Sequence, residues 1–278
     1  MTHMFSVQIY CWVQVYEQQK KNAHDYMEEV LAQTKEAGYQ AIELSFPTKE
    51  NADRARELLP KSGLKLPSMY VGGKMHEENW RETVELAATK ARWGREFGAK
   101  VVVVNPDPIA WGKLLDKTDD QLKRQAEALQ TLGEKVSAEG MQLAYHTHDA
   151  EMRQSAREFH HMMQATDAEH VGFCFDTHWV FRGAGNSQLA MFDVFKMYKS
   201  RLKSLHLRQS QAGVWTETFG EGDIDYPRLA NLLREMNFQG PMTLEQCFET
   251  GTELKLPPVE RFKRTREAAE KIFNHQGK

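Results

Sequence analysis

The chain has 278 residues, of which 41% are hydrophobic and 27% are charged. Its formal net charge of -3 comes without a basic stripe, so neither nucleic acid nor an anionic membrane has an electrostatic surface to bind. No segment has the roughly 20 consecutive apolar residues of a membrane helix. The three cysteines are few and far apart, which is typical of small buried side chains in a reducing cytoplasm. We therefore expect a cytoplasmic protein with no nucleic-acid or membrane partner.

Short apolar or β-branched runs alternate along the chain with charged amphipathic stretches. We predict strands over Phe5–Val13, Gln40–Ser45, Leu64–Val71, Lys100–Asn105, Gln142–His148, Val171–Asp176, Leu202–Arg208 and Met242–Gln246. Between them we predict helices over ranges that include His24–Ala37, Glu77–Phe97, Asp119–Ala138, Ala150–Ala165 and Val259–Phe273. Gly38, Gly98 and Gly140 follow three of these stretches and are expected to be left-handed C-caps. The first strand is preferred over a signal peptide because glutamines interrupt its short apolar run.

The regular alternation predicts a parallel sheet, and eight repeats favour its closure into a barrel of roughly 250 residues. The alternative is an open doubly wound sheet, which normally has a glycine-rich phosphate turn after its first strand. Here that position reads CWVQVYEQ and contains no glycine. No linker or low-complexity segment interrupts the pattern. We therefore predict an α/β fold, a single (β/α)8 TIM barrel domain over residues 1–278.

Polar side chains, most of them of metal-binding type, stand at the ends of several predicted strands. They are Glu43, His146, His148, Asp176, His178, His206, Arg208 and Glu245. A single strand histidine is usually a hydrogen-bonded core residue, but four successive strands place imidazoles or carboxylates near the same end. Because burying such groups unpaired is costly, either a metal or a hydrogen-bonded polar cluster must satisfy them together. The mixture of imidazole and carboxylate favours one divalent ion of Mn, Zn, Fe or Co.

These strand ends resemble those of the xylose isomerase-like superfamily of sugar isomerases and epimerases. The resemblance covers almost the whole chain and includes EAGYQAIELS, SGLKLPSMYVGG and GEGDIDYPRL. It implies a metal held by Glu, Asp, His and Glu from strands five to eight. Carried over, the last three ligands are Asp176, His206 and Glu245, while His146 stands where the family usually has the first Glu. The YHTH segment resembles the YHNH or YHHH segments of inosose dehydratase-like members.

The resemblance implies proton transfer next to the carbonyl of a ketose or related polyol, with the metal acting as a Lewis acid. Glu245 and His148 are the candidate catalytic groups that move the proton. We predict a metal-dependent sugar isomerase or epimerase of carbohydrate metabolism. A dehydratase or lyase of a keto-polyol or keto-glycoside is the alternative, because the first carboxylate ligand is replaced. A non-catalytic sugar-binding barrel is the alternative of another class, and the net charge disfavours endonuclease IV-like DNA repair.

Five residues are predicted to contact the small sugar or polyol substrate: Trp12, Glu43, Asn105, His178 and Arg208. Structural alternatives accompany several of them. Trp12, like Trp111, either forms an apolar wall against the sugar or packs in the core. Glu43 either binds hydroxyls or pairs with a rim arginine, and Asn105 either contacts substrate or caps a turn. Barrel enzymes of this kind are often oligomers, which allows a homo-oligomer here.

Overall fold

The computed structural model describes residues 3–274. Its parallel strands are β1 (Phe5–Gln8), β2 (Ala41–Glu43), β3 (Ser68–Gly73), β4 (Val101–Pro106), β5 (Gln142–Tyr145), β6 (Val171–Asp176), β7 (Leu202–Leu207) and β10 (Met242–Leu244). A short antiparallel hairpin of β8 (Ser210–Gln211) and β9 (Val214–Trp215) follows β7. The succession of eight parallel strands with helices between them is that of a (β/α)8 barrel, so the predicted fold class is confirmed.

Helices connect these strands in chain order. They are α1 (Ile9–Gln18), α2 (Met27–Glu36), α3 (Lys49–Ser62), α4 (Trp80–Glu96), α5 (Asp119–Ala138), α6 (Asp149–Ala165), α7 (Thr177–Gly183), α8 (Gln188–Tyr198), the 3-10 helix η1 (Lys199–Arg201), α9 (Tyr226–Glu235) and α10 (Pro258–Asn274). No helix within residues 3–274 is both long enough and apolar enough to cross a membrane.

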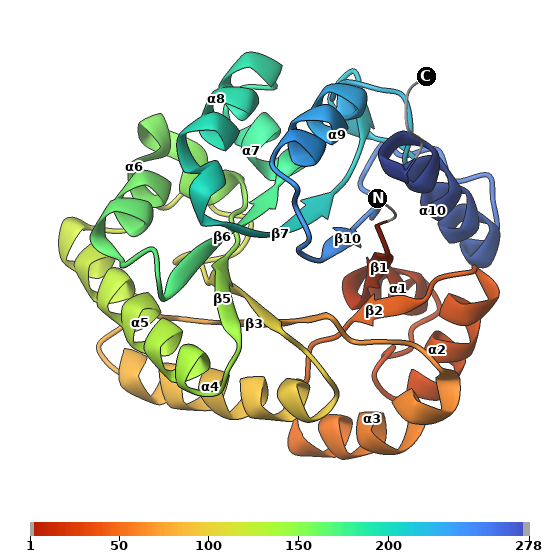
Figure 1. The fold of residues 1–278 in the computed structure, drawn as a ribbon, viewed down its shortest axis with the longest axis horizontal. Helices are drawn as coiled ribbons and strands as arrows, with labels where there is room; N and C mark the ends of the chain where they lie inside the picture. Colours follow the sequence, from red (N-terminus) through yellow and green to blue (C-terminus); the bar gives the residue numbers. More distant parts are fainter. Residues whose placement is uncertain (1–2, 275–278) are drawn as a thin grey trace. The chain divides into compact units, whose positions relative to one another are not determined.

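The chain divides into two compact units, and the first contains the described residues up to Pro67 and from Leu205 onward. Its parallel strands follow the order β2, β1, β10, β7, with Ser6 in register with both Ala41 and Thr243. On the outside, α10 packs against β1, α2 and α9 (Figure 1). Trp12 of α1 contributes to the same core, because its ring lies edge-on to Phe262 at 4.5 Å.

The second unit is Ser68–Ser204, and its strands follow the order β6, β5, β4, β3. Val101, Val103, Ala144 and Cys174 form a buried cluster in which neighbouring strands contribute small or β-branched side chains. Outside the strands, α4 packs against β3 and α5 against β5 (Figure 1). Helices therefore cover β3 and β5 on one face, as expected of βα repeats.

The first predicted strand is too long, because β1 ends at Gln8 and α1 begins at Ile9. The Gln8 side chain accepts a hydrogen bond from the backbone N–H of Tyr10 and so caps the helix. Cys11, Trp12 and Val15 then share one buried helical face. The run IYCWVQVY is rich in strand-forming residues, and this cap together with burial of one helical face overrides that preference. The helices α1, α3, α7, α8 and α9 are absent from the predicted ranges.

The predicted helix ends are confirmed at the three glycines. Gly38, Gly98 and Gly140 have φ values of 83°, 97° and 73°, a left-handed conformation that other residues adopt at a steric cost. At the other end of α5, Thr118 and Gln121 form a reciprocal capping box. The helix α6 differs from the regular stretch that we predicted, because residues 153–156 inside it leave the helical conformation.

Candidate functional site

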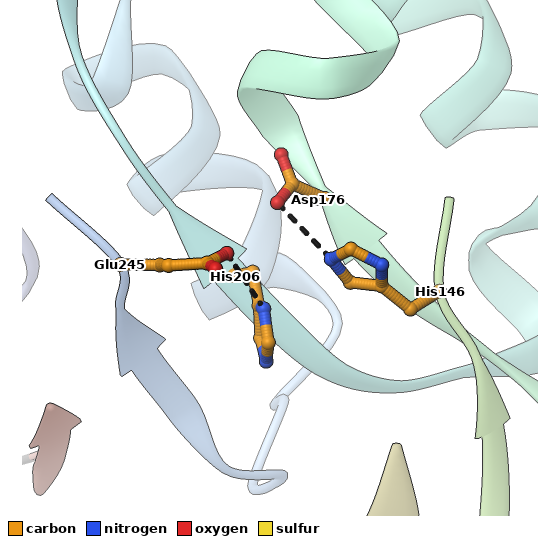
Figure 2. Close-up of side chains that lie close together, drawn as sticks. All are labelled: His146, Asp176, His206 and Glu245. Carbon is orange, nitrogen blue, oxygen red and sulfur yellow. Dashed lines mark hydrogen bonds and ion pairs between the residues drawn. The ribbon is translucent and has the colours of Figure 1, made fainter. Parts of the chain in front are cut away.

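In the second unit, the ends of β5 and β6 bring an imidazole and a carboxylate together. His146 follows β5, Asp176 ends β6, and both side chains are buried. Figure 2 shows His146 Nε2 facing Asp176 Oδ2, at a distance of 3.2 Å. The other oxygen, Oδ1, accepts a hydrogen bond from the backbone N–H of Trp179 at 2.8 Å and so caps α7. The strand-to-helix turn thus fixes the direction in which Asp176 points.

His148, the predicted catalytic histidine, lies within a group of aromatic rings. Its ring centroid lies 5.1 Å from that of Trp111, 5.2 Å from Trp179 and 4.9 Å from His146. Trp111 belongs to the loop between β4 and α5 and is 58% exposed. An exposed indole edge next to an imidazole offers a flat apolar surface on which a sugar ring can rest. An apolar surface against the sugar was one of the two roles that the sequence offered for Trp111, but the sequence did not indicate that His148 lies beside it.

A buried pair, Asn105 and Glu151, holds the segment that carries both histidines. Asn105 Nδ2 donates to the His146 carbonyl and to Glu151 Oε1, each at 3.3 Å. Glu151 Oε2 accepts from the His148 backbone N–H at 2.7 Å. Burial raises the pKa of Glu151 to about 7, with repulsion from Glu158 adding to the shift. Glu151 was missed from the sequence, although a Glu three residues after a helix start is a capping signal.

In the first unit, His206 of β7 lies between two carboxylates. Its Nε2 is 2.8 Å from Glu43 Oε1, and its Nδ1 is 3.2 Å from Glu245 Oε2. Figure 2 shows the Glu245 side of this arrangement. Glu245 also pairs with Arg208, whose Nη2 lies 2.9 Å from the same Oε2 and whose Nε donates to the Glu245 carbonyl. All four side chains are buried.

Besides the Arg208 guanidinium, the close approach of His206 Nδ1 to Glu245 Oε2 requires a proton or a cation between these two atoms. Glu43 Oε1 and His206 Nε2 lie at an ion-pair distance of 2.8 Å. Because an ionised carboxylate can only accept, such a close approach favours a proton on Nε2. In a neutral imidazole the other nitrogen, Nδ1, then carries a lone pair, and that lone pair faces Glu245 Oε2. Two acceptors 3.2 Å apart repel each other unless a proton or a metal cation lies between them. The residues present therefore fit a bound cation.

The four predicted ligands, His146, Asp176, His206 and Glu245, are buried imidazole and carboxylate groups that could hold a metal ion. Two nitrogen and two carboxylate donors suit Mn, Zn, Fe or Co better than they suit an ion that prefers oxygen alone. The donor chemistry thus agrees with the resemblance.

The remaining predicted substrate contacts have the following places. Trp12 is fully buried in the core beside Phe262. His178 is buried on α7, with its ring centroid 5.8 Å from that of Phe181. Arg208 has its guanidinium 4.1 Å from the ring centroid of Trp215. Their roles toward a substrate stay predictions, as do those of Glu43 and Asn105.

Residues 31–272 match the family described as "Xylose isomerase-like TIM barrel". Over 238 residues the chain is 29% identical to "Inosose dehydratase" of Lacticaseibacillus casei, which covers 75% of this chain and 78% of that relative. A solved "L-ribulose 3-epimerase" covers 99% of this chain and 95% of its own, with 17% identity and a TM-score of 0.76. "D-allulose 3-epimerase from Methylomonas sp. in complex with D-allulose" covers 98% and 97%, with 12% identity and a TM-score of 0.74. The chain therefore belongs to the xylose isomerase-like TIM barrel family, as its sequence predicted.

Proposed function

We propose that the protein is a divalent-metal-dependent lyase that removes water from an inosose or a related keto-polyol. One observation carries the proposal. At the end of β5, His146 stands at the position where the epimerase ligand pattern has a glutamate, and its Nε2 lies 3.2 Å from Asp176 Oδ2. Epimerisation by two ligating glutamates would then lack one of its two carboxylates. The relative from Lacticaseibacillus casei, named inosose dehydratase, supports dehydration over epimerisation.

In this proposal His146, Asp176, His206 and Glu245 hold one divalent ion. When bound, the ion supplies Lewis-acid polarisation of the substrate carbonyl, which makes the neighbouring C–H bond more acidic. Arg208 Nε donates to the Glu245 backbone carbonyl, and Nη2 pairs with the Glu245 carboxylate at 2.9 Å and so orients it. Glu245 keeps the largest exposed fraction of the four ligands, 8%, so it is the ligand best able to touch a substrate.

The chain's own residues would carry out an elimination. Glu245 accepts the proton from the carbon next to the carbonyl, and the electron pair of that C–H bond forms a C=C bond. The hydroxyl on the following carbon leaves with its C–O bond electrons, and His148 donates the proton that makes it water. Imidazole is the side chain most often used for proton transfer near neutral pH. The Trp111 and Trp179 rings lie beside the His148 ring, with centroids 5.1 and 5.2 Å from it.

Isomerisation or epimerisation of a ketose or related polyol is the second candidate, because it shares the first proton transfer. Glu245 and His148 would then return a proton to a neighbouring carbon or to the opposite face instead of expelling a hydroxyl. A cytoplasmic location, a role in carbohydrate metabolism, a homo-oligomeric state and a single domain over residues 1–278 stay predictions.

The test is incubation of the protein, loaded separately with Mn, Co, Zn or Fe(II), with inososes and ketoses in D2O, followed by NMR and mass spectrometry. A product that has lost one water supports the dehydratase. A deuterated product of otherwise unchanged composition supports the isomerase or epimerase. Binding without deuterium exchange or product, with every metal, would contradict both and favour a non-catalytic sugar-binding barrel. The Asp176→Asn variant is the control for each metal.

A further inference from the structure

The first unit contains a carboxylate that the proposed reaction does not use. Glu43, at the end of β2, is fully buried, with its Oε1 2.8 Å from His206 Nε2. Its Oε2 accepts a hydrogen bond from Thr243 Oγ1 at 3.3 Å. Glu43 and Thr243 are 200 residues apart in sequence and come together through β1, which pairs with both β2 and β10.

We infer that Glu43 is a positioning residue that holds His206 in the tautomer with Nε2 protonated and Nδ1 free to bind the metal. This inference rests on the proposed function, in which His206 is a ligand. A carboxylate that accepts the second N–H of a ligating histidine fixes the tautomer, orients the ring and strengthens the bound nitrogen as a donor. Thr243 would in turn orient Glu43.

Three features of the geometry favour this role over a contact with substrate. The Glu43 carboxylate has no exposed surface, whereas a group that meets a substrate hydroxyl must reach the solvent side of the site. A buried carboxylate needs polar partners: Thr243 Oγ1 donates to its Oε2, and the His206 ring forms an ion pair with its Oε1. The His206 nitrogen on the opposite side, Nδ1, faces Glu245, which is the other ligand that this unit contributes.

Glu43→Ala removes the acceptor and is expected to weaken metal binding by about 10- to 100-fold, the usual effect of losing such a partner. Glu43→Gln still offers one amide oxygen to Nε2–H, so the expected loss is smaller, although the charge is gone. Thr243→Val leaves the carboxylate in place and is expected to cost about fivefold, the effect of one hydrogen bond. The graded order of the three variants would not follow from a general packing defect.

Ser6→Ala is the matched control. Ser6 is buried on β1 in register with Thr243, and its hydroxyl has no hydrogen-bond partner among residues 3–274. The Ser6→Ala substitution removes a buried hydroxyl from the same sheet and leaves Glu43 and Thr243 unchanged. Metal affinity of this variant should equal that of the wild type. Thermal unfolding and near-ultraviolet circular dichroism establish that each variant is folded before its affinity is compared.

The experiment is titration of the metal-free protein with Zn2+ and Mn2+, measured by competition with a chelating indicator. It is combined with NMR of the zinc-loaded protein labelled with 15N in histidine. We expect the graded losses, and a His206 ring protonated at Nε2 in the wild type. Folded Glu43 variants with wild-type affinity, or a His206 ring bound through Nε2, would overturn the inference and leave the proposed function standing. A wild type that binds no metal would overturn both, whereas graded metal loss without any turnover would overturn only the proposed reaction.

Discussion

Asp176 uses its two oxygens for different purposes: Oδ2 lies 3.2 Å from His146 Nε2, and Oδ1 accepts the backbone N–H of Trp179. The first contact belongs to the proposed metal site and the second to the start of α7. The two roles can be separated by substitution, because asparagine is as good a helix N-cap as aspartate but carries no charge.

Asp176→Asn is therefore expected to lose bound metal and activity while keeping the wild-type free energy of unfolding measured without metal. Asp176→Ala should lose both the metal and the cap, and unfold at a free energy lower by about 1 kcal/mol. Elemental analysis gives the metal content, and urea denaturation of metal-free protein gives the stability. An Asp176→Asn protein that retains wild-type metal content would contradict the ligand assignment.

Trp111 is expected to affect substrate binding more than the chemical step. Its ring is largely exposed and touches His148 only at an edge, so Trp111→Ala removes apolar surface without disturbing the core. An aromatic contact of about 0.5–1.5 kcal/mol corresponds to a KM raised by roughly 2- to 10-fold, with kcat nearly unchanged. Leu114→Ala, at an 83% exposed position on the same loop, is the control. A large fall in kcat with unchanged KM would show that Trp111 acts on catalysis instead.

Glu151 is expected to make stability depend on pH between about 4.5 and 7. Burial raises its pKa from the ordinary 4.5 to about 7, so in this interval the folded protein binds a proton that the unfolded chain releases. Stability from this group is therefore present at low pH and falls as the pH rises, by at most about 1.4 kcal/mol per pH unit. Glu151→Gln cannot ionise and should lack this fall.

Urea denaturation of the wild type and of Glu151→Gln at pH 5, 6, 7 and 8 measures the effect as a difference between the two proteins. As the pH rises, the free energy of unfolding of Glu151→Gln should increase relative to that of the wild type. Glu134→Gln, at an exposed position on α5, is the control and should run parallel to the wild type. Parallel curves for Glu151→Gln as well would mean that the carboxylate is already ionised throughout this range.

The three cysteines are expected to be unreactive in the folded protein. All are buried and free, and Cys11 Sγ lies 3.3 Å from Cys247 Sγ. Burial raises the pKa of the Cys11 thiol well above its usual value, so little thiolate is present at neutral pH. Ellman's reagent should label less than one thiol per chain in buffer and all three in urea. Rapid labelling of Cys247 in buffer would show that the segment after β10 opens.

Local patterns in the sequence determined the fold class and the candidate ligands. Apolar runs of strand length, amphipathic stretches and C-cap glycines recur at the spacing of βα units, and each depends only on neighbouring residues. Polar residues at strand ends could then be assigned to one end of a parallel barrel. The resemblance to the xylose isomerase-like family implied which of them are the ligands, namely His146, Asp176, His206 and Glu245. Ligand type followed because imidazole and carboxylate are recognisable from residue identity alone.

Tertiary structure alone decided which partner each of these groups meets. The hydrogen bond from Thr243 to Glu43 joins residues that are 200 positions apart, and no periodicity in the sequence relates them. Likewise, Asn105 reaches Glu151 across 46 positions, and their burial is what sets the Glu151 pKa. Even the end of β1 was decided this way, because its residues suit a strand and burial of Cys11, Trp12 and Val15 on one face makes them a helix. Side-chain direction and desolvation arise from packing, so neither can be read from the order of residues.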